Sequence, residues 1–177
     1  MFKILFLFLV ASIFAQEEPT ISWNEHKKVT WEDFRSQPKP RSDVVAVTAS
    51  GLSFGYSTTR YSGGRIEYDF EVTAHFYPER SWYIKEDVTA RTLAHERLHF
   101  DITELHARKF RQRVQNTRFT RNIDREMEKI NNDIHDELRA MQRQYDSETS
   151  HSRIPEKQLE WQEYVKVELN KLDRFKK

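Results

Sequence analysis

The sequence predicts an α+β domain in which a small antiparallel sheet comes first and a helical half follows. Apolar and polar residues alternate through residues 66–76, which is the period of a half-buried strand. From about residue 87 onward, apolar residues instead recur at the spacing of a helix. Strands followed by helices favour an α+β arrangement over a βαβ sheet.

Turn and breaker residues divide the chain into its predicted elements. Ser62-Gly63-Gly64 is a turn signal between two strands. The predicted elements are a helical turn at 30–34 with Thr30 as its N-cap, strands at 44–49, 52–57 and 66–76, and helices at about 87–116, 123–145 and 156–175. Residues 147–155 are expected to form a polar connector between the last two helices.

Length and charge limit how many domains the chain can form and which kinds of partner it can bind. The chain has 177 residues, which is room for one domain. Its 29 basic and 28 acidic residues give a net charge of +1, and this balance argues against a nucleic-acid binder built on a basic face.

The first fifteen residues have the pattern of a secretory signal peptide. Lys3 supplies a positive charge, residues 4–14 are largely apolar, and Ala15 precedes a polar segment. The apolar run is shorter than the roughly 20 residues that a membrane-spanning helix needs. The chain has no cysteine, which excludes a lipoprotein anchor and disulfides. We therefore expect cleavage after Ala15 and a single domain over residues 16–177 that is secreted or periplasmic, without stable membrane insertion.

The segment most indicative of chemistry is His95-Glu96-Arg97-Leu98-His99, an HExxH motif in a predicted helix. Residues four apart lie on the same side of a helix, so His95 and His99 can direct two imidazoles at one metal ion. Glu96 is then placed to take a proton from a metal-bound water. The apolar flanks predict that this turn is buried, where two histidines and a glutamate need partners. The motif predicts a zincin-like fold with Zn²⁺ as the cofactor.

Spacing alone leaves the third metal ligand open. His106 lies about 10 Å further along a continuous helix, too far to share the ion. An antiparallel hairpin turning near residue 118 would bring positions 136–140 of the second helix opposite the two histidines. The candidates are the helix-two residues Glu126, Asp133, His135, Asp136 and Glu137, and the connector residues Asp146, Glu148 and His151.

Other residues have weaker claims on the site. Tyr145 is a candidate to polarise a substrate carbonyl, although a tyrosine that ends an apolar stripe is more often a core residue. Asp101 and Glu104 are candidates to hold the metal histidines in place, or else to pair with Arg108 or Lys109 on the helix surface.

Two motifs together give the chain a family resemblance. The segment from His95 to Glu104 has the form HExxHFDxxE, and the segment from Tyr145 to His151 has the form YDxETxH. With Trp31-Glu32-Asp33-Phe34, they resemble the bacterial family called domain of unknown function 922, which is similar to zinc peptidases. The resemblance implies a third ligand at His151, with Asp146 and Glu148 as alternates. The family usually has glycine after that histidine, where this chain has Ser152.

The leading hypothesis is therefore a secreted zinc-dependent metallopeptidase. Zinc and Glu96 would activate a water to attack a peptide bond in a peptide or protein substrate. Strand 66–76 is a candidate to bind an extended peptide along its edge. The alternative is a non-catalytic envelope-binding domain in which the metal only stabilises the fold.

Overall fold

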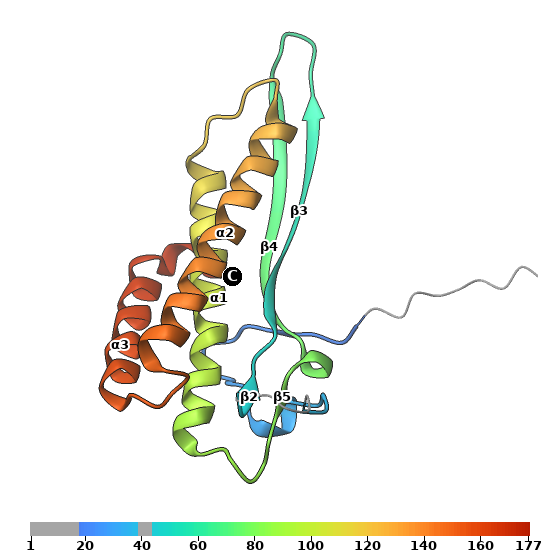
Figure 1. Ribbon diagram of the computed structural model, residues 1–177. Coiled ribbons are helices and arrows are strands. Elements are labelled where there is room, and N and C mark those ends of the chain that lie inside the picture. Colours follow the sequence, from blue (N-terminus) through green and yellow to red (C-terminus); the bar gives the residue numbers. More distant parts are fainter. Residues whose placement is uncertain (1–17, 39–43) are drawn as a thin grey trace, which may run out of the picture.

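A computed structural model describes residues 18–38 and 44–177, and it has the predicted α+β architecture with a small antiparallel sheet and three α-helices (Figure 1). The expected signal peptide at residues 1–15 lies outside the described residues. The elements in chain order are β1 (Ile21–Ser22), η1 (Trp31–Asp33), β2 (Ala46–Val47), β3 (Ser50–Arg60), β4 (Ile66–Phe76), η2 (Pro78–Arg80), β5 (Trp82–Tyr83), α1 (Ala90–Asn116), α2 (Ile123–Thr149), α3 (Pro155–Lys171) and η3 (Asp173–Phe175).

A long β3–β4 hairpin dominates the sheet. The two strands pair antiparallel from Ser50 opposite Phe76 to Arg60 opposite Ile66, and β1 pairs with the other edge of β4 at Ile21 and Ser22. At the hairpin tip, Gly63 and Gly64 have φ angles of 94° and 85°, which explains why glycines stand at this turn. The predicted strand at 66–76 is thus confirmed as β4, with partners on both sides.

A second, two-stranded sheet lies beside the start of α1. The strand predicted at 44–49 is observed only as the short β2, which pairs antiparallel with β5, Ala46 opposite Tyr83 and Val47 opposite Trp82. The chain then turns into β3 at Ser50, earlier than the predicted strand start at 52. The other edge of β2 has no strand partner within the described part of the chain.

The three helices lie on one side of the hairpin, with α1 between it and α3 (Figure 1). Helix α1 begins at Thr89, whose hydroxyl accepts a hydrogen bond from the Thr92 backbone N–H, and fifteen of its 27 residues are buried. Helix α2 continues through Thr149, so the predicted connector at 147–155 was wrong in its first three residues. No proline or glycine interrupts residues 147–149, and Asp146 and Glu148 therefore lie on α2.

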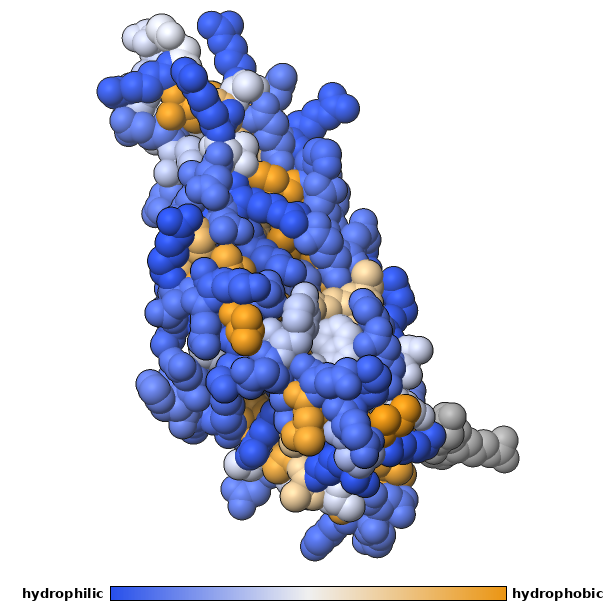
Figure 2. All heavy atoms as spheres, turned by 90° about the vertical axis from the view of Figure 1, so that its left-hand side faces the viewer, coloured by the Kyte–Doolittle hydropathy of each residue, from blue (hydrophilic) through white to orange (hydrophobic). Residues whose placement is uncertain are grey.

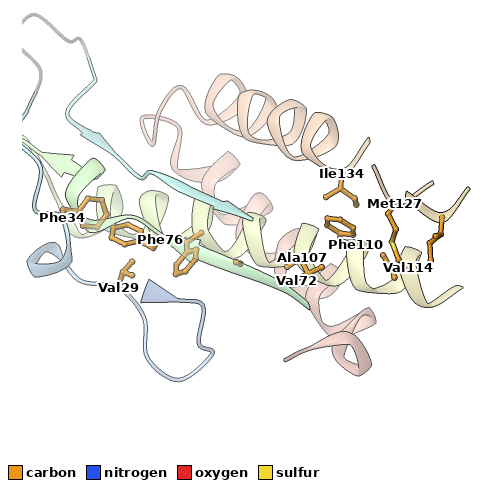
Figure 3. Packing of buried hydrophobic residues seen from close by; sticks show 12 residues of the cluster. Val29, Phe34, Val72, Phe76, Ala107, Phe110, Val114, Met127 and Ile134 are labelled. Carbon is orange, nitrogen blue, oxygen red and sulfur yellow. The ribbon is translucent and has the colours of Figure 1, made fainter. Parts of the chain in front are cut away.

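The largest apolar core fills the space between the hairpin, α1 and α2, and it includes Phe76, Phe110, Met127 and Ile134 (Figure 3). The residues of α1 that face α3 instead include several polar side chains, which are buried because this helix is covered on both sides. The molecular face on the α3 side is largely hydrophilic, with scattered apolar residues (Figure 2). Within the two described ranges, none of the helices has a stretch long and apolar enough to cross a membrane.

Candidate metal centre

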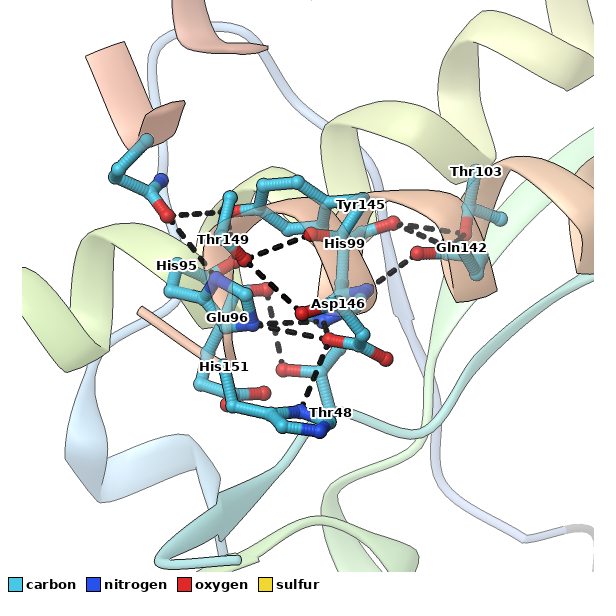
Figure 4. A network of polar contacts seen from close by, with 11 residues as sticks. Thr48, His95, Glu96, His99, Thr103, Gln142, Tyr145, Asp146, Thr149 and His151 are labelled. Carbon is cyan, nitrogen blue, oxygen red and sulfur yellow. Dashed lines mark hydrogen bonds and ion pairs between the residues drawn. The ribbon is translucent and has the colours of Figure 1, made fainter. Parts of the chain in front are cut away.

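Two facing helices build the candidate metal centre (Figure 4). His95 and His99 lie one turn apart on α1, and Asp146 comes from the last turn of α2. These three residues form a group that could hold a metal ion. His95 is buried at 2% exposure, while the Asp146 side chain keeps 30% of its surface and opens the group to solvent.

The three ligand atoms form a nearly equilateral triangle. The Nε2 atoms of His95 and His99 are 3.2 Å apart, and Oδ1 of Asp146 lies 3.1 Å from the first and 3.0 Å from the second. In a tetrahedral zinc site with bonds of about 2.0–2.1 Å, neighbouring ligand atoms are about 3.3 Å apart. The triangle therefore has the dimensions of one face of such a site.

Hydrogen bonds at the Nδ1 atoms determine which nitrogen of each neutral imidazole carries the proton. Nδ1 of His95 lies 3.0 Å from Oε1 of Gln158, and Nδ1 of His99 contacts Oε1 of Gln142. Because an amide oxygen only accepts hydrogen bonds, each neutral imidazole has its proton on Nδ1. Both Nε2 lone pairs and a carboxylate oxygen then converge on one point, an arrangement that requires a cation or a proton between them.

The close approach of these three groups also shifts the pKa values of Asp146 and His99. Burial works to raise the pKa of Asp146, but its hydrogen bonds to His95 and His99 hold that pKa well below the usual range. Burial works to lower the pKa of His99, but the hydrogen bond to Asp146 and the charge of Glu96 bring it above its ordinary value. The metal-free site thus keeps a carboxylate and attracts a proton, and a divalent cation would displace that proton.

Glu96 is the carboxylate beside this triangle. It is only 5% exposed, and its Oε2 has no hydrogen-bond partner among the described residues. Glu96 lines a cleft of about 500 Å³ together with the three ligand candidates, residues 44–48 and the first turn of α1. A buried carboxylate oxygen without a partner is costly unless a water or a substrate group meets it.

Tyr145 packs against the two histidines of the candidate metal centre. It is fully buried, its ring stacks on His95 with centroids 4.4 Å apart, and its hydroxyl donates to Oε1 of Gln158 at 2.8 Å. Burial raises the pKa of Tyr145 well above its ordinary value, so the hydroxyl stays neutral. The residues described as lining the cleft do not include Tyr145, and its contacts are those of a support for His95.

His151 stands at the rim of the cleft, on the turn that follows α2. Its Nδ1 lies 3.4 Å from Oδ1 of Asp146, and its side chain is 48% exposed. Ser150, His151 and Ser152 all have positive φ angles, of 48°, 52° and 70°. Each costs about 1 kcal/mol or more for a residue other than glycine. The His151 ligand assignment remains a prediction, and Asp146, one of its alternates, completes the group with the two histidines.

The other acidic candidates lie elsewhere. Glu148 accepts hydrogen bonds from Gln144 and Trp161, and the candidate acids of α2 pair with neighbours: Glu126 with Thr120, Asp133 with Lys129, Asp136 with Arg139, and Glu137 with Arg113. Asp101 binds Trp23 and Lys28, while Glu104 binds Arg108 and Arg111. None of these acids holds a metal histidine.

The stretch of α2 opposite the histidines lies further along than predicted. Residues 142–146 contact the pair, instead of 136–140. The loop between the helices spans residues 117–122 and centres the turn near 120, which accounts for about four of these six residues. The two glutamines that hold the imidazoles were missed. Gln142 precedes Asp146 by four residues and so shares its helix face, which was a usable signal. Gln158 gave no local signal, because only the packing of α3 brings it to His95.

Fold and site define an α+β domain with a candidate metal centre on its central helix. The chain matches the model of the family described as "Bacterial protein of unknown function (DUF922)" over residues 22–152, and it belongs to this family. No curated protein and no solved structure matches the chain.

Proposed function

We propose that this protein is a metal-dependent hydrolase, most specifically a zinc metallopeptidase with a zincin-like active-site helix. The observation that carries the proposal is the triangle of His95, His99 and Asp146 beside the unpartnered Oε2 of Glu96. Two imidazoles and one carboxylate suit zinc, and three protein ligands leave a position open, as in hydrolytic zinc sites.

Each site residue has a chemical role in this proposal. A divalent cation held there would supply Lewis acidity for a scissile carbonyl and its attacking water. Glu96 accepts the proton of that water and later passes it to the leaving amine, so its carboxylate ends each turnover unprotonated. The neutral Tyr145 holds the His95 ring in place by stacking on it. His151 faces the side of the cleft that would receive the substrate.

The strand that lines the cleft supports an extended peptide as the substrate. The strand 66–76, considered as a peptide-binding edge, is β4 and lies in the middle of its sheet. β2 instead lines the cleft and pairs only with β5 among the described strands. Thr48 fastens this segment to α1, since its hydroxyl donates to the Glu96 carbonyl at 3.1 Å. A substrate strand added to β2 would therefore run past Glu96.

We also propose that the activity belongs outside the cytoplasm. The N-terminal pattern of Lys3, the apolar run at 4–14 and Ala15 supports export. Substrates would then be proteins or peptides of the envelope or the surroundings.

The test compares hydrolysis by wild type and Glu96→Gln. Zinc-loaded proteins are incubated with denatured casein and with a mixed-sequence peptide library, and zinc content is measured in parallel. We expect wild type to cleave, Glu96→Gln to lose about 10²- to 10⁴-fold in rate while keeping its zinc, and the surface control Glu128→Gln to match wild type. A wild type that holds zinc but cleaves neither probe would contradict catalysis. It would favour the alternative, a non-catalytic envelope-binding domain in which the metal only stabilises the fold.

A further inference from the structure

The C-terminal helix takes part in the candidate metal centre, although the family match ends at residue 152, before α3 begins. Gln158, on the first turns of α3, is 3% exposed and reaches across to His95 of α1. Its Oε1 lies within hydrogen-bond distance of both the His95 Nδ1, at 3.0 Å, and the Tyr145 hydroxyl, at 2.8 Å. One amide oxygen thus joins three helices at the site.

The orientation of this amide decides which nitrogen of His95 is free for a metal. With Oε1 toward the ring, His95 must donate from Nδ1, and Nε2 keeps its lone pair in the ligand triangle. With the amide reversed, an N–H would face Nδ1 and the imidazole proton would move to Nε2. That proton would then occupy the space of the metal.

Tyr145 is the second group that contacts the same amide oxygen. The Nε2 of Gln158 is buried and has no partner among the described residues, so it gives the amide no preference of its own. The Tyr145 hydroxyl can donate to Oε1 of Gln158, and it does so beside a second acceptor, the His95 carbonyl at 3.3 Å. By comparison, Gln142 is oriented by its own Nε2, which donates to the His99 carbonyl at 2.9 Å.

We propose that Gln158 is a positioning residue that sets the His95 tautomer and thereby makes the metal site competent, as Gln142 does for His99. The inference rests on the metal site of the proposed function. Both partners are neutral amides, so they direct the imidazoles without adding negative charge. The cation then meets only the charges of Asp146 and Glu96, which preserves its Lewis acidity.

The first experiment reads the tautomers directly in metal-free protein. Imidazole ¹⁵N spectra at about pH 9 are recorded for wild type, Gln158→Met and the control Gln162→Met. We expect both site histidines to carry the proton on Nδ1 in wild type and in the control. In Gln158→Met, we expect His95 alone to shift toward the Nε2–H form. A wild-type His95 with its proton on Nε2 would overturn the inference.

The second experiment measures zinc affinity by competition with a chelator. Gln158→Met should bind zinc about 10- to 100-fold more weakly than Gln162→Met, and Tyr145→Phe should be weakened to a lesser degree. Gln158→Glu keeps two acceptor oxygens and should restore binding. Equal affinity of Gln158→Met and Gln162→Met would overturn the inference, whereas a wild type without zinc binding would defeat the proposed function and leave the tautomer test standing.

Discussion

Two polar clusters lie about three turns apart on α1 from centre to centre, and they differ in whether they contain charges of both signs. In the arginine cluster, Oε1 of Glu104 accepts from Arg108 at 3.0 Å and from Arg111 at 3.2 Å. The same two guanidinium groups also donate to backbone carbonyls, Arg108 to Leu169 and Arg111 to Phe175 and Val72. In the metal cluster of His95, His99 and Asp146, three acceptor atoms face one another.

The difference separates a structural cluster from a functional one. The arginine cluster contains its own counter-charge and ties α1 to β4 and to the C-terminal segment, so it is complete within the chain. The metal cluster lacks a positive partner of its own and is completed by a cation or a proton. Burial and polarity alone do not distinguish the two, because both lie on the covered helix.

Breaking the arginine cluster should have the largest effect on stability. Glu104→Leu removes the buried carboxylate shared by two guanidinium groups, whose side chains are 3% and 9% exposed, and leaves Arg108 only the exposed Asp173 at 3.6 Å. We expect a loss of about 3–5 kcal/mol in the free energy of unfolding, measured by urea denaturation of metal-free protein. The exposed pair Arg113–Glu137 is the control, and Glu137→Gln should cost about 1 kcal/mol or less. Equal losses would show that Glu104 is not a compensating charge.

Breaking the metal cluster should instead affect binding. Asp146→Ala removes one of the three ligand atoms, and we expect zinc affinity to fall more than about 100-fold, because even partners outside the ligand set cost 10–100-fold. Chelator competition gives the affinity, and Asp136→Ala, which loses only a surface pair with Arg139, is the matched control. Unchanged affinity in Asp146→Ala would exclude this carboxylate as a ligand.

His106, another histidine of α1, sharpens the comparison, since it is buried and its ring has one hydrogen-bond partner among the described residues, the Ile102 carbonyl at 2.9 Å. Burial lowers the pKa of His106 to about 4 from an ordinary 6.5. The unfolded chain therefore binds a proton at a higher pH than the folded one, and stability falls as the pH drops from about 6.5 toward 4.

The size of this loss is about 2 kcal/mol at pH 5 in metal-free protein. His106→Gln should remove this part of the pH dependence, whereas the exposed control His26→Gln should retain it. Denaturation curves at pH 7 and pH 5 give the values. The same slope in His106→Gln and wild type would contradict a buried neutral His106.

The smallest effect concerns the turn that carries His151. Ser152 has a φ of 70°, a conformation that glycine adopts without strain. We expect Ser152→Gly to stabilise the protein by about 1 kcal/mol and to leave zinc affinity unchanged, as measured by thermal unfolding and chelator competition. A destabilised Ser152→Gly would mean that the Ser152 side chain supports the turn more than its backbone strains it.

The comparison also explains what could be predicted from the sequence. The α+β class, strand 66–76 and the placement of His95 and His99 on one helix face follow from periods of two and of 3.6 residues, which are local properties. The contacts of Asp146 and Gln158 depend on where the α1–α2 loop turns and how α3 packs. A two-residue change in the turn centre moves the facing register by about four of the six residues observed, so spacing alone did not identify the third ligand. No pattern in the sequence pointed to Gln158.

The most direct test of the account is the metal content of wild type purified without added metal, measured by elemental analysis beside His95→Ala. The metal cluster predicts about one zinc ion per chain in wild type and almost none in the variant. No bound metal in wild type, or equal metal in both proteins, would contradict a cation-completed site at His95, His99 and Asp146.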